Sequence, residues 1–317
     1  MTTLLEKPTK MKWSNIKENI NYSNCSMKMS LHIIVLIIVG LAGACTEDKG
    51  EVNQLESVLI KVRSDNQFGK ILTDIDGRAL YFYANDSFGN GISIDSCSEM
   101  WKVFNVDLKI ETISSELDIN DFKIIIRADG RRQISYKGRP LYLYTFKQNG
   151  NFVHEQAGEL SGEGKDNVWF VAKPDYTITL SNAQLVGYDG NNYTNNYKEG
   201  LGKTMYFTDA WGQTLYTYTY DSKNQNSFTL PDFSNNYLWP IYEEDQIVVP
   251  SLLDKKLFGS IYGKKQLTYK GWPLYFFSRD LKQMGSNKGV SFPMSGGIWP
   301  VPVKDMIDAP KKVDMGL

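Results

Sequence analysis

The chain has 317 residues, of which 42% are hydrophobic and 22% charged, and this is the composition of an ordinary globular protein. Its formal net charge is −1 at pH 7, so we expect no nucleic-acid partner, because nucleic-acid binding depends on neutralising phosphates. The whole chain holds two histidines and three cysteines, which excludes a catalytic or metal site built on several histidines.

Residues 27–44 have the features of a secretory signal peptide: a short basic start, an apolar run at 31–41 and small residues before Cys45. The cysteine at the cleavage point makes this segment resemble a bacterial lipoprotein signal, which implies that Cys45 is the lipidated first residue of the mature protein. A membrane-spanning anchor is the weaker alternative, because the run is shorter than the ~20 residues that span a bilayer. Residues 1–26 are polar, and we interpret them as an extension from a start codon assigned too far upstream.

The segment 45–56 is interpreted as the lipidated cysteine and a polar tether. An acylated terminus holds a folded domain at a membrane without a spanning helix. We therefore expect a protein of the bacterial cell envelope, at the outer membrane and facing the periplasm or the cell surface. Its expected partners are the membrane, through the anchor, and an unidentified protein or small molecule. Cys97 is the only cysteine after Cys45, so the folded part cannot form an internal disulfide.

Four later segments repeat one pattern, in which a glycine turn precedes Leu-Tyr and an aromatic residue follows two positions on. The segments are 77–83, 138–144, 212–218 and 271–277. The first and third copies share one upstream pattern, and the second and fourth share Gln-x-x-Tyr-Lys-Gly. Each copy is followed by a tryptophan, at Trp101, Trp169, Trp239 and Trp299. Such repetition indicates a repeat architecture, and we expect an A-B-A-B order in two similar modules, 57–178 and 179–303, before a tail at 304–317.

The repeated segments have the residues and the alternation of β-strands, most regularly at 214–220. The glycine before each Leu-Tyr predicts a hairpin turn, and Pro140 and Pro273 predict a strand start or an edge strand. Further short strands are expected at 168–172 and 298–301. Helical signals are sparse, with single turns expected at 96–103 and 118–122. The sequence therefore predicts a mostly β protein of tandem β-hairpin repeats, with little helix outside the leader.

These residues resemble a known family, the bacterial secreted or lipoprotein repeat of unknown function with a Tyr-x4-Asp motif. The motif is kept at Tyr81 and Asp86, at Tyr216 and Asp221, and at Tyr275 and Asp280, whereas the second copy has Tyr142 with Lys147 in the place of Asp. The resemblance implies a β repeat fold and an envelope address, and it supplies no activity. It also implies a Cys-x3-Cys pair before the first tryptophan, but Ser93 and Cys97 stand there, so that pair lacks one thiol.

The repeated Asp86, Asp221 and Asp280 are open to a catalytic and a structural interpretation. Glycoside hydrolysis needs two carboxylates at a defined separation, and this reading requires two of the three to converge on one pocket. A residue that recurs at the end of the same element more often caps a turn by accepting backbone N–H groups. We favour the structural role, and we expect the motif tyrosines to be core residues whose hydroxyls bond a neighbouring repeat.

No cofactor or metal is predicted, but two weaker candidates are open. The segments 74–77 and 188–192 have the acidic and glycine residues of a calcium loop, yet neither completes an EF-hand. His154 is interpreted as an exposed residue of a polar loop, and its use by a non-covalent haem is the less favoured alternative.

Trp211 and Trp272 stand beside turn glycines and are candidates for an interaction surface; the alternative is that each covers its own hairpin. Taken with the leader and the repeats, these features favour a lipid-anchored envelope protein that is not an enzyme and that binds a partner or supports an assembly. An envelope accessory protein for redox chemistry or a cofactor is the first alternative. A carboxylate-based hydrolase is the second.

Overall fold

The computed structural model describes residues 58–91, 99–261 and 266–312. All the described residues belong to one compact unit, Gln54–Leu317. The predicted leader, Cys45 with its tether, and Cys97 lie outside the described residues. Within the described ranges, no helix combines the length and apolar character that crossing a bilayer requires.

The described part of the chain is mostly β, which confirms that part of the predicted fold class. Its strands are β1 (Ile60–Asp65), β2 (Gly69–Asp74), β3 (Leu80–Tyr83), β4 (Trp101–Val103), β5 (Phe122–Ile126), β6 (Arg132–Tyr136), β7 (Arg139–Pro140), β8 (Tyr142–Gln148), β9 (Asn151–His154), β10 (Trp169–Val171), β11 (Thr179–Val186), β12 (Asn192–Tyr193), β13 (Lys203–Thr208), β14 (Phe258–Ile261), β15 (Gln266–Tyr269) and β16 (Trp272–Pro273). The helices are short 3-10 turns: η1 (Ile110–Thr112), η2 (Ile119–Asp121), η3 (Lys165–Asn167), η4 (Lys255–Leu257), η5 (Ser278–Asp280) and η6 (Lys288–Ser291).

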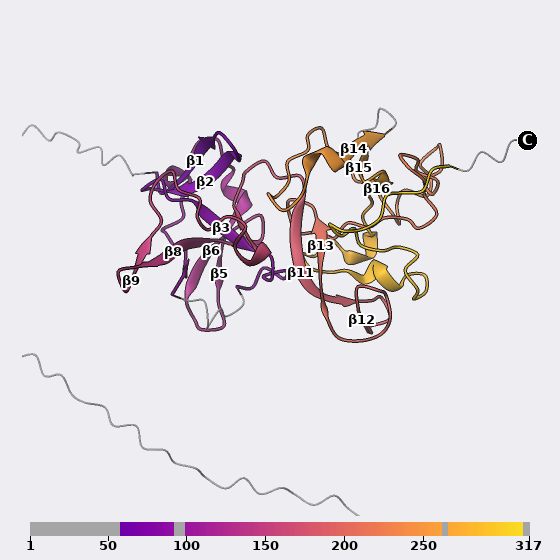
Figure 1. Cartoon of the computed structure of the whole chain (residues 1–317), viewed down its shortest axis with the longest axis horizontal. Helices are drawn as coiled ribbons and strands as arrows, with labels where there is room; N and C mark the ends of the chain where they lie inside the picture. The colour runs from indigo at the N-terminus through magenta and orange to yellow at the C-terminus, as the bar shows by residue number, and fades with distance from the viewer. Residues whose placement is uncertain (1–57, 92–98, 262–265, 313–317) are drawn as a thin grey trace, which may run out of the picture. The chain divides into compact units, whose positions relative to one another are not determined.

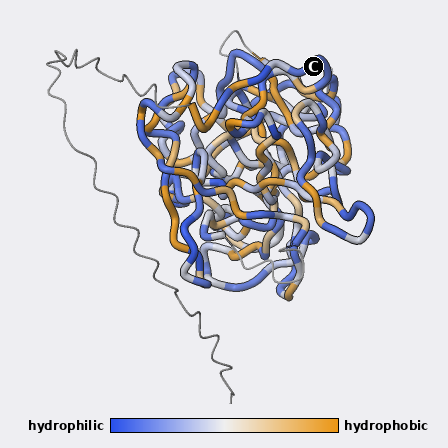
Figure 2. Tube along the Cα trace, turned by 90° about the vertical axis from the view of Figure 1, so that its left-hand side faces the viewer, coloured by the Kyte–Doolittle hydropathy of each residue, from blue (hydrophilic) through white to orange (hydrophobic). Residues whose placement is uncertain are grey.

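The strands pair antiparallel into several small sheets (Figure 1). The largest has the order β10-β3-β8-β4, and β9 pairs with β8 beside that path. In it the first two Leu-Tyr segments lie side by side, with Leu80 opposite Leu143 and Tyr81 opposite Tyr142. The other sheets are β1-β2, β5-β6-β7, β12-β11-β13 and β14-β15-β16. Along the trace, apolar segments alternate with hydrophilic turns, as expected for strands that bury one face (Figure 2).

The predicted glycine turns are confirmed by their backbone conformation. The glycines before the four Leu-Tyr segments have φ values of 81°, 81°, 76° and 83° at Gly77, Gly138, Gly212 and Gly271. In the second and fourth copies the preceding lysine also has a positive φ, 46° at Lys137 and 49° at Lys270, which is the two-residue turn that suits a twisted hairpin. The prolines that follow lie in β7 and β16, each at the edge of its sheet, where a missing N–H is tolerated.

The segment 214–220 was predicted as a strand, and it forms no regular strand. Tyr216 and Tyr275 do exchange two backbone hydrogen bonds, both with N···O distances of 2.9 Å. The same pairing joins Tyr81 and Tyr142 in the largest sheet. The third and fourth copies therefore begin the same ladder as the first two, but do not extend it.

Two prolines explain why the segments on either side of this pairing do not extend it into a wider sheet. Thr217 donates its N–H to the carbonyl of Pro300 at 2.9 Å, and Phe276 donates to that of Pro240 at 2.8 Å. Neither proline can return a hydrogen bond, because proline has no backbone N–H. The expected strand at 298–301 is not found: Ile298 and Trp299 lie in a bend, and no strand is formed at Pro300 and Val301.

One of the two predicted helical turns is confirmed. Asp118 caps η2 by accepting a hydrogen bond from the N–H of Asn120 at 2.9 Å. The prediction at 96–103 is wrong for its described end, where Trp101–Val103 is strand β4. Trp101 lies opposite Tyr144 of β8, so sheet pairing with a distant segment decides the conformation there rather than the local serine signal.

Candidate functional site

Two tryptophans stack face to face at the centre of the first aromatic cluster. The ring centroids of Trp101 and Trp169 are 3.7 Å apart with an interplanar angle of 7°, and Tyr83 stacks on Trp169 at 4.2 Å. The rings of Tyr81 and Tyr142 meet the two indoles edge-on, at 5.4 and 5.1 Å. Both of these motif tyrosines are fully buried, which confirms that they are core residues.

The second aromatic cluster repeats this arrangement with the third and fourth copies. Trp239 and Trp299 stack at 3.7 Å and 9°, and Tyr218 stacks on Trp299 at 4.5 Å. Tyr216 and Tyr275 meet these indoles edge-on at 5.4 and 5.3 Å. Each tryptophan that follows a Leu-Tyr segment therefore belongs to a stacked pair, and each pair joins two copies.

Each motif tyrosine donates its hydroxyl to an acidic residue that follows a different Leu-Tyr copy. Three of the four acceptors are the motif aspartates. The O···O distances are 2.6 Å for Tyr142 and Asp86, 2.7 Å for Tyr275 and Asp221, and 2.6 Å for Tyr216 and Asp280. The expectation that these hydroxyls bond a neighbouring repeat is thus confirmed, and the bonding is reciprocal between the third and fourth copies.

The fourth acceptor is Glu155, which the sequence reasoning missed. Lys147 stands at the motif position but is exposed, because β8 continues past the aromatic residues and forms a hairpin with β9. The hairpin brings the chain back, so that Glu155 accepts from the Tyr81 hydroxyl at 2.8 Å through both carboxylate oxygens. The signal in the sequence is the strand-like alternation up to residue 148 followed by Asn-Gly, which predicts a hairpin in place of the usual turn.

The same carboxylates also hold their own loops. Glu155 accepts from the N–H of Ser161 at 2.9 Å, and Asp221 accepts from the N–H of Ser227 at 2.7 Å, six residues later in each case. Asp280 accepts from the Ser286 hydroxyl at 2.7 Å and from the N–H of Lys288 at 2.9 Å. Each of these side chains therefore links the loop that follows it to a tyrosine of another copy.

Burial favours the neutral form of these acids. It raises the pKa of Glu155 to about 7, against the opposing effect of the hydrogen bond from Tyr81. It also raises the pKa of Asp221 and of Asp280, although hydrogen bonds from tyrosine, serine and backbone groups oppose the shift. Ionisation of these acids is therefore unfavourable in their buried positions, and the hydrogen bonds that they accept partly offset this effect.

Two glycines allow the loops to approach the motif tyrosines, and both were missed in the sequence. A Cβ atom on Gly162 would lie 2.9 Å from the Tyr81 ring, and a Cβ on Gly289 would lie 2.6 Å from the Tyr216 ring. Neither approach leaves room for a side chain. Gly289 also donates its N–H to the Tyr216 hydroxyl at 3.2 Å.

The hydrolase alternative requires two of the repeated aspartates to line one pocket. Asp280 lines a groove of about 580 Å³, while Asp86 and Asp221 do not line it. We call it the acidic groove, and its lining includes Asp209, Tyr242, Glu243, Glu244, Phe276 and Asp280. Both carboxylate oxygens of Asp280 are hydrogen-bonded within the protein, as expected for a structural role.

The acidic residues of the two candidate calcium loops are bonded within the protein. In the first, Arg78 Nη2 lies 2.6 Å from Asp74 Oδ2 and 2.8 Å from Asp76 Oδ2. In the second, Asp189 accepts from the Tyr193 hydroxyl and, at 3.1 Å, from Ser291 Oγ. Across residues 58–91, 99–261 and 266–312, no three His, Cys, Asp or Glu side chains gather as a metal site would require.

His154 does not lie in an exposed loop, so that prediction is wrong. It ends β9, opposite Thr145 of β8, and is half-buried. Its Nδ1 atom is buried without a hydrogen-bond partner in the described part of the chain. Burial and the nearby Arg78 lower the pKa of the imidazole, which favours the neutral ring.

The two tryptophans proposed for an interaction surface differ in exposure. Trp211 is 43% exposed, with Lys137 Nζ 6.0 Å from its ring centroid. Trp272 is 8% exposed, and its indole N–H donates to the carbonyl of Ile307 at 2.9 Å. The prediction is therefore corrected for Trp272, because the segment near the C-terminus covers it.

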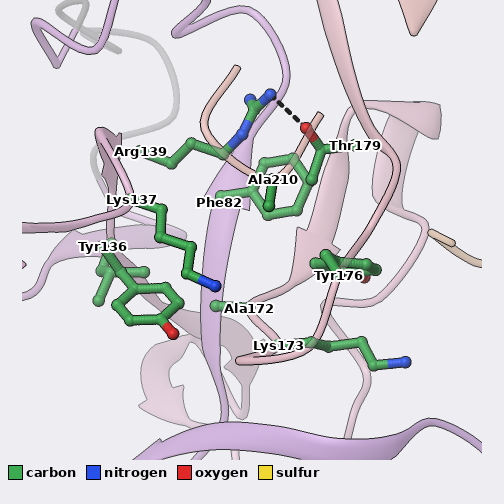
Figure 3. A pocket seen from close by; sticks show the side chains of 10 residues that line it. Phe82, Tyr136, Lys137, Arg139, Ala172, Lys173, Tyr176, Thr179 and Ala210 are labelled. Carbon is green, nitrogen blue, oxygen red and sulfur yellow. Dashed lines mark hydrogen bonds between the residues drawn. The ribbon is translucent and has the colours of Figure 1, made fainter. Parts of the chain in front are cut away.

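A basic pocket lies beside Arg139 and Lys137, with Phe82 and Tyr136 among its walls (Figure 3). The buried Arg139 donates through Nη2 to Thr179 Oγ1 at 2.6 Å, and burial lowers the pKa of this guanidinium to about 10. The free space is about 20 Å³, which is room for one water molecule rather than for an organic ligand.

The comparisons with known proteins identify one repeat. Residues 259–301 match the model of a family described as a secreted repeat of unknown function. This segment contains the fourth Leu-Tyr copy and Trp299, and the match confirms the family resemblance. No curated protein and no solved structure is significantly similar to the chain.

Proposed function

We propose that this chain, whose residues 259–301 carry a secreted repeat, is a non-catalytic binding or structural module of the bacterial cell envelope. The observation that carries the non-catalytic part is the engagement of the repeated acids. Glu155, Asp221 and Asp280 each accept from a tyrosine hydroxyl and from the loop that follows. Acids held in this way stabilise the fold and are not available to react with a substrate.

The proposal includes the A-B-A-B order of two duplicated modules, 57–178 and 179–303. The two aromatic clusters support it, because each contains one stacked tryptophan pair and two edge-on tyrosines. The Gln-x-x-Tyr-Lys-Gly segments support it as well. In both, the glutamine amide donates to the carbonyl of the leucine before the motif tyrosine, at 2.8 Å from Gln133 to Leu141 and at 3.1 Å from Gln266 to Leu274.

The proposed address is the outer membrane, through a lipid on Cys45. The test is metabolic labelling of the full chain with an alkyne-tagged fatty acid in a Gram-negative host. We expect label on the wild type and on Cys97→Ser, which is the matched control, and no label on Cys45→Ser. A wild type without label, or a Cys45→Ser variant that keeps it, would contradict the lipid anchor.

The proposed non-catalytic role also predicts that the purified protein holds no metal and no cofactor. Elemental analysis and an absorption spectrum of the full chain, purified without chelator, should show no stoichiometric metal and no visible band. A stoichiometric metal or a haem spectrum would instead favour the alternative role as a redox or cofactor accessory protein.

A further inference from the structure

Two Asp-x-x-Gly turns in the chain close with the same hydrogen bonds. In the first, the N–H of Asp74 donates to the carbonyl of Arg78 at 2.9 Å; in the second, the N–H of Asp209 donates to that of Gln213 at 2.9 Å. The aspartate side chains close the same turns with a second hydrogen bond. Asp74 Oδ1 accepts a hydrogen bond from the N–H of Arg78 at 2.9 Å, and Asp209 Oδ1 accepts one from the N–H of Gln213 at 2.8 Å. Asp209 therefore stands where Asp74 stands, and Gln213 stands where Arg78 does.

The two aspartates differ at the second carboxylate oxygen. Asp74 Oδ2 accepts a hydrogen bond from Arg78 Nε at 2.7 Å and lies 2.6 Å from Arg78 Nη2. Two nitrogens of the same guanidinium group therefore bind this oxygen. Asp209 Oδ2 has no hydrogen-bond partner among the described residues, although the side chain is only 7% exposed. This oxygen is not one of the enclosed polar atoms that lack a partner, so it is open to the solvent of the acidic groove, which Asp209 lines.

Among the described residues, no positively charged side chain forms an ion pair with Asp209. Arg139 is near enough to act on it electrostatically, but its Nη2 atom is bonded to the hydroxyls of Thr179 and Thr208 at 2.6 and 2.9 Å. Lys282 also lines the groove, where it is exposed and makes no ion pair with Asp209.

The other walls of the groove suit a flat organic cation. Glu243 and Glu244 add negative charge, and the half-buried ring of Phe276 adds aromatic surface. A guanidinium group is planar, binds carboxylates through two parallel N–H donors and stacks on aromatic faces. The volume of about 580 Å³ is in the range of small-molecule sites.

We propose that the acidic groove binds a guanidinium group, which takes at Asp209 the place that Arg78 takes at Asp74. The ligand is either a free alkylguanidine or an arginine side chain of a polypeptide, since both present this group. The inference rests on the proposed binding role and is independent of the lipid anchor, so fatty-acid labelling at Cys45 and guanidinium binding fail separately.

The experiment is calorimetric titration of the detergent-solubilised full chain with agmatine and with an acetyl-Gly-Arg-Gly-amide peptide, at neutral pH. We expect saturable binding of at least one of them, and no binding of n-butylurea, a neutral compound of similar shape. Binding of agmatine assigns the free alkylguanidine as the source, and binding of the peptide alone assigns a polypeptide. Absence of saturable binding by both would overturn the proposal.

Two variants and a control make the test specific. Asp209→Asn should weaken binding at least about tenfold, the loss expected for a charge-assisted hydrogen bond. Gln213→Arg should also abolish binding while keeping the fold, because it supplies its own guanidinium to Asp209. Asp308→Asn, an exposed residue outside the groove, should leave the affinity unchanged. Equal affinity in the wild type and in both groove variants would contradict the assignment to Asp209.

Discussion

At the scale of single residues, the molecule depends on a hydrogen bond between a buried phenol and a buried carboxylate. Neither group is favourable alone in an apolar core, because each leaves a polar atom without water. Paired, Tyr81 and Glu155 satisfy one another at 2.8 Å, and the remaining capacity of Glu155 is used by the loop N–H of Ser161. The pairs are therefore expected to contribute stability mainly by preventing unsatisfied buried groups.

The first prediction removes one hydroxyl. Tyr81→Phe should lower the free energy of unfolding by about 1–3 kcal/mol, the cost of leaving a buried polar group without its partner. Tyr144→Phe is the matched control, because Tyr144 is also a buried ring of the first aromatic cluster but its hydroxyl makes no hydrogen bond within the described residues. Urea unfolding of the full chain measures both. Equal losses in the two variants would contradict a special role for the Tyr81 hydroxyl.

The second prediction concerns pH. Burial raises the pKa of Glu155 from 4.5 to about 7 in the folded protein, so the folded state binds more protons than the unfolded state between these values. Stability from this residue is therefore present at low pH and is lost as the pH rises from about 4.5 to about 7. Glu155→Gln keeps an acceptor for Tyr81 and should flatten the fall. Unfolding curves of both proteins at pH 5, 6, 7 and 8 measure it; parallel curves would refute the assignment.

At the scale of elements, local chemistry predicts the turns and edges well. The glycines before each Leu-Tyr segment, Pro140 and Pro273 have conformational limits that act within a few residues, so their roles can be read from the sequence. Pro240 and Pro300 act across the chain instead. Their missing N–H groups interrupt ladders with Phe276 and Thr217, and a single sequence does not say which segments those prolines face.

The identity of the fourth acid could not be predicted for a similar reason. The motif spacing points to Lys147, and only the course of the β8–β9 hairpin shows that Glu155 reaches Tyr81. The burial of Trp272 against Ile307 and the place of His154 in β9 are also consequences of tertiary pairing. The repeat pattern thus predicts the acid that accepts from a motif tyrosine in three copies. In the second copy, only the structure identifies Glu155 in this role.

The third prediction tests that exception. Glu155→Ala should destabilise the protein by about 1–3 kcal/mol, because it leaves the buried Tyr81 hydroxyl unpaired. Adding Lys147→Asp gives the second copy the Tyr-x4-Asp spacing of the other three but should restore no stability, since residue 147 is exposed on β8. Thermal unfolding of the single and double variants decides this. Recovery in the double variant would show that the second copy can use the usual motif position.

The fourth prediction concerns the close approach of a loop to a ring. Gly289→Ala places a methyl group 2.6 Å from the Tyr216 ring, and overpacking of this kind costs about 1–3 kcal/mol. Unfolding measurements on the variant test it. A neutral substitution would mean that the loop at η6 can shift without disturbing the second aromatic cluster.

At the scale of the whole molecule, the four copies depend on one another. A stacked tryptophan pair takes one ring from each of two copies, and each motif tyrosine takes its acceptor from beyond another copy. A single copy would thus contain one tryptophan without its stacking partner, and a motif tyrosine and an acid without their hydrogen-bond partners. Repeat proteins in general gain stability from interfaces between neighbouring units, and here the interface is made of buried polar pairs as well as apolar surface.

The central claim is that the motif acids are structural links between copies, and a double-mutant cycle on Tyr275 and Asp221 tests it most directly. The two side chains are 2.7 Å apart at the hydroxyl and Oδ2. Unfolding free energies of Tyr275→Phe, Asp221→Asn, the double variant and the wild type, all as the full chain at neutral pH, give their coupling energy. The account predicts a coupling of about 1–3 kcal/mol. Additivity within about 0.5 kcal/mol would contradict it, because it would mean that the acid stabilises its own turn without the tyrosine of the other copy.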